Sequence, residues 1–195
     1  MAESPRLAGP RILLRGFRRE DARSLFELAR DPIVTRHMGW PPPQAVGETE
    51  AFITKALADQ AGETPPCVHF CIALVAKEEP IGVTSLFAID REHHHATVGS
   101  WIGQPHWGRG LMRESKALLF KVAFEMLGLE RLQAWVDVDN HRSISSLENC
   151  GFRREGLARR HAFHQGRHVN QMLMAILRGE ETDLVNEMLG GNGAA

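Results

Sequence analysis

The chain has 195 residues, of which 43% are apolar and 24% charged, the composition of a single globular domain with a sizeable core. Its formal net charge of -1 creates no overall field that would attract nucleic acid or a membrane surface, so we expect neither as a partner. Its three cysteines show no zinc-ligand spacing, and residues 1–10 lack the apolar stretch of a signal peptide, which favours a cytoplasmic protein.

The first predicted elements are a strand and a helix. Residues 11–17 alternate, with Ile12 and Leu14 apolar, and predict a strand. Residues 20–30 predict a helix because apolar residues recur at i, i+3, i+4 and i+7. We expect this helix to end at Asp31, since the residue before a proline avoids the helical region.

An irregular segment and a meander follow. Residues 37–43 hold three prolines and Trp40, which exclude regular structure. A second helix is predicted over residues 44–61, and then three strands close enough in sequence to form an antiparallel meander, at 68–76, 81–89 and 96–102. We interpret the three histidines at 93–95 as a solvated hairpin turn and not a metal site, because alternate side chains of a strand point to opposite faces.

The second half of the chain predicts alternating helices and strands. The elements are a long helix from the loop at 103–110 to about Gly128, a strand at 132–138, a short helix at 139–151, and two closing strands, from 152 onward and at 169–177. This order predicts an α+β fold, a sheet with helices on its faces. We expect one domain over residues 11–180, with a flexible N-terminus (residues 1–10) and a C-terminal tail (residues 181–195).

The loop before the long helix has the chemistry of an anion site. Small residues let backbone N–H groups approach a ligand, and the start of a helix adds a partial positive charge. A pyrophosphate would suit this cradle, although a tight strand-to-helix turn also accounts for a lone Gly-x-Gly motif. The residues concerned are Trp107, Gly108, Arg109, Gly110, Leu111 and Met112.

The start of the short helix carries a polar residue. Asn140 would serve there as an N-cap, which is an adequate role by itself. The two helix starts follow strands that we expect to be adjacent in the sheet. They can therefore converge on one ligand.

Together these motifs resemble the GNAT acetyltransferases, and in particular the RimJ/RimL-like branch that includes the ribosomal-protein N-terminal acetyltransferases. The resemblance covers roughly residues 11–180 and implies a mostly antiparallel, twisted sheet with helices on both faces and splayed strands at the cofactor site. The matching segments are Arg11–Arg15, Asp31–Arg36, Val98–Ile102, Trp107–Gly110 with Glu114, Asn140 with Ser143, Gly151–Gly156, and Gly166 with Arg167.

The resemblance also implies an acetyl-CoA-dependent N-acetyltransferase that needs no metal. Backbone groups near Trp101 and Ile102 would pair with the pantetheine arm along the splayed strand, and residues 107–112 would hold the pyrophosphate. Asn140 and Ser143 would reach the pantetheine and the thioester. The amine would attack the thioester directly, so catalysis would rest on proximity, oxyanion stabilisation and deprotonation of the amine.

The chain departs from the family at the residues that move protons. Many relatives place a tyrosine near the thiol as general acid, but this chain has no tyrosine, and Leu147 stands at that position. Ser143, one turn earlier on the same helix face, is the available hydroxyl, with packing or local capping as the alternative. Glu155 matches an acidic family position and is the candidate base, unless it only faces solvent. The catalytic candidates are thus Ser143, Asn140 and Glu155.

On the acceptor side, Trp40 and the prolines after it would narrow the cleft, and His161 and His164 are candidate proton carriers, with a structural role in the core or at the surface as the alternative. We expect the acceptor to be a protein N-terminal α-amine, because its pKa of ~7.7–8.0 lies far below the ~10.4 of lysine and suits a site without a strong base. The alternatives are a small-molecule amine as acceptor and, from the missing tyrosine, a non-catalytic acyl-CoA-binding module. We expect a monomer or a homodimer.

Overall fold

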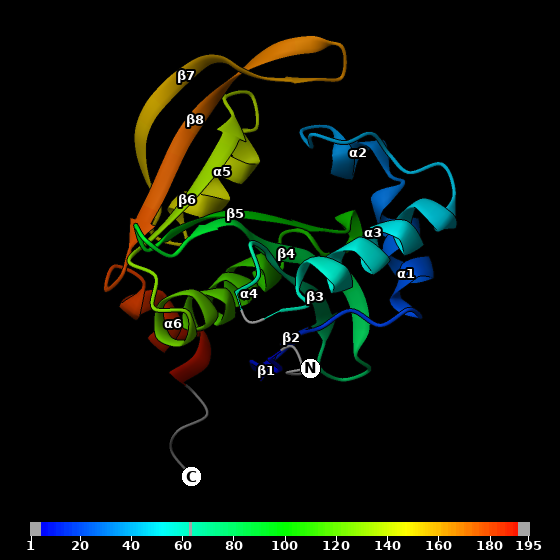
Figure 1. Cartoon of the computed structure of the whole chain (residues 1–195), viewed down its shortest axis with the longest axis horizontal. Coiled ribbons are helices and arrows are strands. Elements are labelled where there is room, and N and C mark those ends of the chain that lie inside the picture. The colour runs from blue at the N-terminus through cyan, green and yellow to red at the C-terminus, as the bar shows by residue number, and fades with distance from the viewer. Residues whose placement is uncertain (1–4, 63, 191–195) are drawn as a thin grey trace.

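Helices cover both faces of one sheet in the computed structural model, which describes residues 5–62 and 64–190 (Figure 1). The eight strands lie in the order β1-β2-β3-β4-β5-β6-β8-β7, and every neighbouring pair is antiparallel apart from β5 and β6, which are parallel. This arrangement confirms the predicted α+β class with a mostly antiparallel sheet.

The strands are β1 (Leu7–Ala8), β2 (Ile12–Arg15), β3 (Val68–Leu74), β4 (Glu79–Asp90), β5 (His95–Ile102), β6 (Arg131–Asp137), β7 (Arg153–His164) and β8 (Arg167–Leu177). The α-helices are α1 (Asp21–Ala29), α2 (Pro32–Thr35), α3 (Val46–Asp59), α4 (Leu111–Phe120), α5 (His141–Glu148) and α6 (Thr182–Leu189). A 3₁₀ turn, η1 (Gln104–His106), precedes α4, and a π-helical turn, η2 (Lys121–Met126), continues it.

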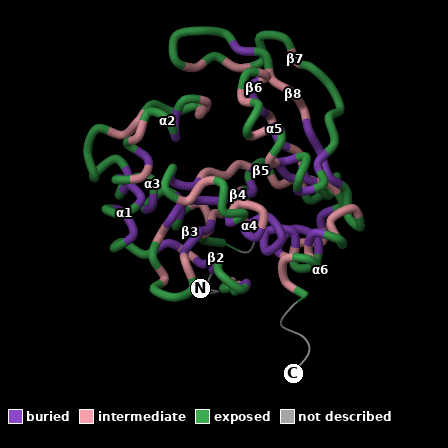
Figure 2. The backbone as a smooth tube through the Cα atoms, turned by 180° about the vertical axis from the view of Figure 1, so that it is seen from behind, coloured by how far each residue is buried: buried purple, intermediate pink, exposed green. Residues whose placement is uncertain are grey.

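Apolar side chains fill both faces of the sheet. Along β3, Phe70 and Ile72 belong to the core that contains α4, whereas Cys71 and Ala73 belong to the core that contains α1 and α3. Because both faces are covered, β3 is an almost continuous apolar run and not an alternating strand. Figure 2 shows burial concentrated in the centre of the sheet and in α4, while β7 at the edge is largely exposed.

The structure confirms most of the predicted elements. Strands β3, β4 and β5 form the antiparallel meander, and β7 and β8 form the closing hairpin. The helix after the glycine-rich loop is present, although its second half is π-helical before Gly128, whose φ is 66°. The predicted histidine turn joins β4 to β5, where the backbone N–H of His93 donates to Asp90 Oδ1 (2.7 Å).

One short helix was not predicted, because proline was interpreted as a terminator alone. The first helix does end before Asp31, but Asp31 then caps α2: its side chain accepts from the backbone N–H of Ile33 (2.9 Å). Pro32 occupies the first turn, where its missing N–H costs nothing. This second helix brings the chain back toward the sheet.

Both chain ends contain structure that the sequence analysis did not expect. Strand β1 lies in the expected flexible N-terminus, and α6 lies in the expected C-terminal tail, where it packs on α4 with Leu184 buried. Residues 1–4 and 191–195 of these segments lie outside the described residues. Among the described residues, no helix combines the length and the apolar character needed to cross a bilayer.

The parallel pairing between β5 and β6 is short. It joins three residue pairs, His95 with Arg131, Ala96 with Leu132 and Thr97 with Gln133, and then ends. The rest of each strand stays paired with its other neighbour, β4 or β8. The sheet therefore opens between residues 98–102 of β5 and residues 134–137 of β6, as the predicted splay requires.

Candidate active site

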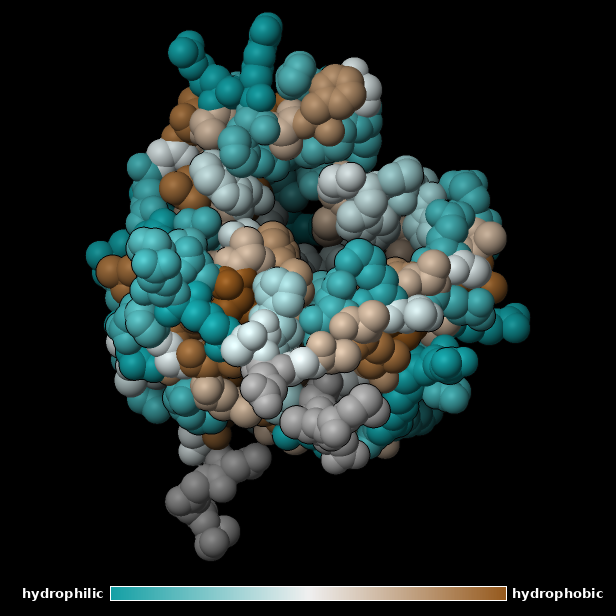
Figure 3. Space-filling model, in the orientation of Figure 1, coloured by the Kyte–Doolittle hydropathy of each residue, from teal (hydrophilic) through white to brown (hydrophobic). Residues whose placement is uncertain are grey.

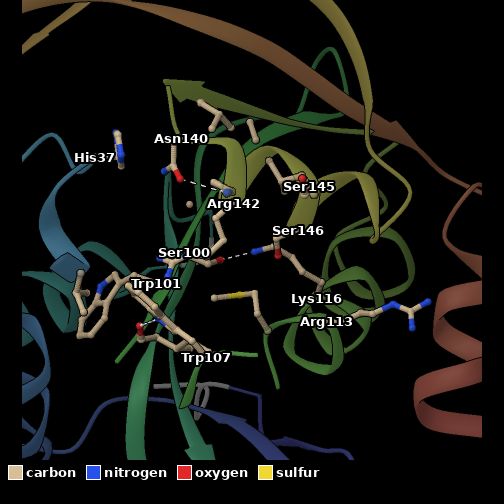
Figure 4. A pocket seen from close by; sticks show the side chains of 18 of the residues that line it. His37, Ser100, Trp101, Trp107, Arg113, Lys116, Asn140, Arg142, Ser145 and Ser146 are labelled. Carbon is tan, nitrogen blue, oxygen red and sulfur yellow. Dashed lines mark hydrogen bonds between the residues drawn. The ribbon is translucent and has the colours of Figure 1, made fainter. Parts of the chain in front are cut away.

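A cavity of about 490 Å³ lies where β5 and β6 separate (Figure 4). Its walls come from the splayed halves of these two strands, from the loop before α4, from the first turns of α4 and α5, and from the segment around α2. Figure 3 shows this face of the molecule hollowed between the α2 segment and the β7–β8 hairpin. Segments far apart in the sequence therefore meet around one space.

Two left-handed glycines shape the loop that enters α4. Gly108 and Gly110 have φ values of 71° and 74°, a conformation that glycine adopts without steric cost. The first bond of the helix runs from the N–H of Glu114 to the carbonyl of Gly110 (3.2 Å), so the three preceding amides have no partner within the helix. These amides lie at the positive end of the helix dipole, where an anion would bind favourably.

Most of the predicted cradle faces the cavity. The residues that line it are Trp107, Gly108, Gly110, Leu111 and Met112. Arg109 does not line it, and its carbonyl accepts instead from Arg11 Nη1 (3.0 Å). The cradle is thus formed from the two glycines and the first turn of α4.

Glu114 fixes the start of α4 against the sheet. Its buried carboxylate accepts from the backbone N–H groups of Arg11 (2.7 Å) and Ile12 (2.9 Å), and from Arg11 Nε (2.8 Å). Hydrogen bonds to an ionised acceptor are stronger than neutral ones, so β2 and α4 are held firmly together. Glu114 therefore positions the cradle without lining the cavity.

Trp107 connects the end of β5 with the start of α5. Its indole Nε1 donates to the carbonyl of Ile102 (2.7 Å), and the guanidinium of Arg142 lies 3.0 Å from its ring centroid. Trp101 and Ile102, both predicted site residues, line the cavity, with the Ile102 carbonyl engaged by Trp107. Burial lowers the pKa of Arg142, which faces the same cavity.

Asn140 and Ser143 lie together at the start of α5, as predicted. The Asn140 side-chain oxygen accepts from the backbone N–H of Ser143 (3.2 Å), which is the N-cap interaction. Both residues line the cavity. Because the cap uses the carbonyl oxygen of the side chain, the NH₂ group of Asn140 remains able to donate to a ligand.

A carboxylate that the sequence analysis did not single out lies at the end of the cavity near α2. Asp137 of β6 is buried and accepts from His164 Nε2 (2.9 Å) and from Gln171 Nε2 (3.1 Å). His37 follows α2 and brings Nδ1 to 3.5 Å from the same carboxylate. Both Asp137 and His37 line the cavity, so this pair can bind an ammonium group and accept a proton.

A lysine is buried in the opposite part of the cavity, as Figure 4 shows from the positions of Lys116 and His37. The Nζ atom of Lys116 donates to Ser100 Oγ, which lies 2.6 Å from Thr84 Oγ1. Loss of solvent lowers the pKa of Lys116 to about 8. The sequence analysis missed Lys116, since a lysine within a helix ordinarily faces solvent.

The structure contradicts the assignment of Glu155 as the base. Glu155 lies on β7, outside the cavity, and forms two hydrogen bonds with Arg131 (2.7 and 2.5 Å). These bonds lower the pKa of the Glu155 carboxyl. A carboxylate paired with a guanidinium away from the cavity cannot take a proton from an amine inside it.

Trp40 and His161 also lie outside the cavity, but each contacts a ring that lines it. Trp40 makes an edge contact with Trp101 (ring centroids 6.1 Å apart), and His161 stacks on Trp135 (4.1 Å). His161 Nδ1 also lies 2.8 Å from Gln171 Oε1. The predicted contact of Trp40 and His161 with the substrate is therefore not found. Each instead packs against a tryptophan that lines the cavity.

Known proteins resemble this chain over most of its length. The family model described as "Acetyltransferase (GNAT) domain" matches residues 11–153, and the chain therefore belongs to the GNAT acetyltransferases. An uncharacterized N-acetyltransferase of Bacillus licheniformis is 31% identical over 174 residues, which cover 87% of this chain and 94% of that protein. A candidate ribosomal N-acetyltransferase of Bacillus subtilis is 31% identical over 99 residues, 51% of this chain and 54% of that one.

A solved structure shares the fold. Spermidine N-acetyltransferase from Vibrio cholerae, determined in complex with CoA and spermine, matches with a TM-score of 0.75 at 24% identity, covering 88% of this chain and 98% of that one. The chain is thus an acetyl-CoA-dependent N-acetyltransferase, and its resemblance to the RimJ/RimL-like branch is confirmed. The alternative of a non-catalytic acyl-CoA-binding module is set aside.

Proposed function

We propose that the enzyme acetylates the α-amine at the N-terminus of a protein or peptide. The distribution of charge around the cavity carries this proposal. Among the described residues that line it, Asp137 is the one carboxylate, whereas Arg113, Lys116 and Arg142 are cationic. A single carboxylate suits an acceptor with one ammonium group. Spermidine carries several, which would lack partners and be repelled by the cationic wall.

The cationic part of the cavity suits acetyl-CoA. The amides at the start of α4 would bind the pyrophosphate, with Arg113 and Arg142 beside them. The pantetheine arm would follow the free edge of β5 into the opening of the sheet. Asn140 and Ser143 would meet the same arm from α5. The V. cholerae spermidine N-acetyltransferase of the same fold contains CoA in its structure, which supports this assignment.

The acceptor part of the cavity supplies a new candidate for the base. Asp137 would hold the incoming ammonium, and His37 would accept its proton, since imidazole is the commonest side-chain base in enzymes. The neutral amine then attacks the thioester carbon, forming an N–C bond as the C–S bond breaks. Asn140 and Ser143 would donate hydrogen bonds to the reacting thioester. The His37–Asp137 pair thus replaces Glu155 as the candidate base.

A panel of amines tests the acceptor. CoA release from acetyl-CoA is measured with a lysine-free peptide, with the same peptide blocked at its N-terminus but carrying one lysine, with spermidine, and with small primary amines. We expect kcat/KM for the free N-terminus to exceed the others at least tenfold, with mass spectrometry placing the acetyl group on the α-amine. A preference for spermidine, a lysine side chain or a small amine would contradict the proposal.

A further inference from the structure

Lys116 is an unusual residue to find inside the cavity wall. It lies within α4 and its side chain is 3% exposed, yet its hydrogen-bond partner is a neutral hydroxyl, Ser100 Oγ, backed by Thr84. It forms no ion pair with any carboxylate of the described residues. A buried ammonium without an anion is costly, and most buried charges in proteins are paired.

The groups around Lys116 do not neutralise it. Cys150, at the end of α5, is the titratable group that acts on it, and burial raises the pKa of that thiol, which keeps it neutral. Arg113 and Arg142, which also line the cavity, are cationic. The Asp137 carboxylate is bound to His164 and Gln171 in the acceptor part. The partner anion must therefore come from the ligand.

We propose that Lys116 is the proton donor to the thiolate of CoA as it leaves the acetyl group. This role rests on the proposed reaction of acetyl-CoA with an amine in this cavity. The amine nitrogen bonds to the acetyl carbon, the C–S bond breaks, and sulfur keeps the electron pair. The thiolate then takes a proton from Lys116 Nζ, which recovers one from solvent. His37 passes the proton of the incoming ammonium to solvent and then accepts the second proton, which the nitrogen loses as it becomes an amide, so charge and atoms balance.

The proton affinities match this role. A thiol has a pKa of ~8.5, close to the value of about 8 for Lys116, so transfer between them is nearly thermoneutral. A serine hydroxyl holds its proton far more tightly than a thiol does. Ser143 can therefore donate a hydrogen bond to the sulfur but cannot supply the net proton. Lys116 thus fills the role for which this chain has no tyrosine.

The thiol of bound CoA reports the proposed contact directly. We titrate it by the ultraviolet absorbance of the thiolate, in complexes of the wild type, Lys116→Met and Lys116→Arg. Lys121→Met is the matched control, because this lysine begins η2, which continues α4, and is partly exposed and paired with Glu125 (2.9 Å). Thermal unfolding shows which variants are folded.

The expected results separate charge from proton donation. In the wild type the bound thiol should ionise at least one pH unit below its value in Lys116→Met. Turnover of Lys116→Met should fall about 10- to 100-fold, the lower part of the range for general acids, since a thiolate is a good leaving group. Lys116→Arg should keep the low thiol pKa yet lose turnover at least tenfold, because arginine does not release its proton. Lys121→Met should match the wild type.

Several outcomes would overturn the proposal. One is a folded Lys116→Met enzyme with wild-type turnover and an unchanged thiol titration. If that variant does not fold, the proposal is still overturned when the thiol of CoA bound to the wild type has the same pKa as in free CoA. Another is a wild-type enzyme that prefers succinyl-CoA to acetyl-CoA, with Lys116→Met reversing this preference. That result would mean that the Lys116 ammonium binds a carboxylate on the acyl group and does not protonate the thiolate. An acceptor other than an α-amine would refute the proposed function and leave the thiol titration unaffected.

Discussion

Replacing Gly110 with alanine, with Gly128→Ala as the control, distinguishes the contribution of the loop before α4 to CoA binding from its contribution to the stability of the fold. Gly110 has φ 74°, and an added Cβ would meet Arg11 Nη2 at 3.6 Å, an ordinary contact. Gly128 has φ 66°, and a Cβ there would meet nothing within 4 Å. The left-handed conformation costs an L-residue about 1–2 kcal/mol, so Gly110→Ala and Gly128→Ala should lose similar stability.

The two variants should differ in their affinity for CoA. Gly110 lines the cavity and directly precedes the free amides of α4, whereas Gly128 lies beyond η2 and does not line it. The left-handed turn at Gly110 presents these amides to the cavity, so a residue with a Cβ would strain this turn and displace the amides from a pyrophosphate. Hydrogen bonds to a charged group contribute about 1.5–3 kcal/mol, and each ~1.4 kcal/mol is tenfold in Kd. Gly110→Ala should therefore weaken CoA binding about 10- to 150-fold.

Calorimetric titration of CoA into both variants measures this difference, and urea unfolding measures the stability that each has lost. We expect comparable shifts of the unfolding midpoint for Gly110→Ala and Gly128→Ala, with wild-type CoA affinity in Gly128→Ala alone. Equal affinities in both variants and the wild type would remove the loop from the cofactor site. Equal weakening in both would mean that general destabilisation, not contact with the pyrophosphate, reduces binding.

Three further substitutions test the remaining assignments. Asn140→Asp keeps an N-cap acceptor but loses the amide donor, so thermal stability should change little while kcat falls at least tenfold; wild-type kcat would leave Asn140 as a cap alone. Asp137→Asn should raise the KM for a peptide amine about tenfold or more while CoA affinity stays constant, and an unchanged KM would place the acceptor elsewhere. Glu155→Gln should keep wild-type activity. Arg131 lowers the pKa of Glu155 in the folded protein. The ionised Glu155 therefore stabilises the fold at pH values above its ordinary pKa, and this stabilisation is lost as the pH falls through the lowered pKa. The stability of Glu155→Gln, measured by unfolding at a series of acid pH values, should therefore depend less on pH than that of the wild type.

The parts of the site that the sequence predicted are those determined by local chemistry. The glycine-rich turn before α4 and the N-cap of Asn140 depend on neighbouring residues, and each leaves a short motif. The convergence of two helix starts followed from the order of elements, which the structure confirms. Such features can be predicted because the interactions that produce them span a few residues.

The residues that the sequence missed or misassigned depend on long-range packing. His37 and Asp137 meet only because α2 folds back toward the opening of the sheet, and nothing near either residue indicates this. Lys116 has the sequence context of a surface lysine, and its burial depends on the placement of α4 against the sheet, where its Nζ reaches Ser100 of β5. Glu155 matched a family position, but its role is decided by Arg131 on another strand.

The opening between β5 and β6 also divides the molecule into two regions of local stability. Three residue pairs join the strands β1–β5 to the strands β6–β8 in the described chain, whereas β3 and β4 are bonded along both edges. In native-state hydrogen exchange, amides of β3 and β4 should therefore be the slowest, and those on the open edges of β5 and β6 considerably faster. A pantetheine arm in the opening would protect these edges and bridge the two regions. Since a ligand that binds the folded state alone stabilises it in proportion to RT ln(1 + [L]/Kd), the supply of acetyl-CoA and the resistance of the enzyme to unfolding are coupled.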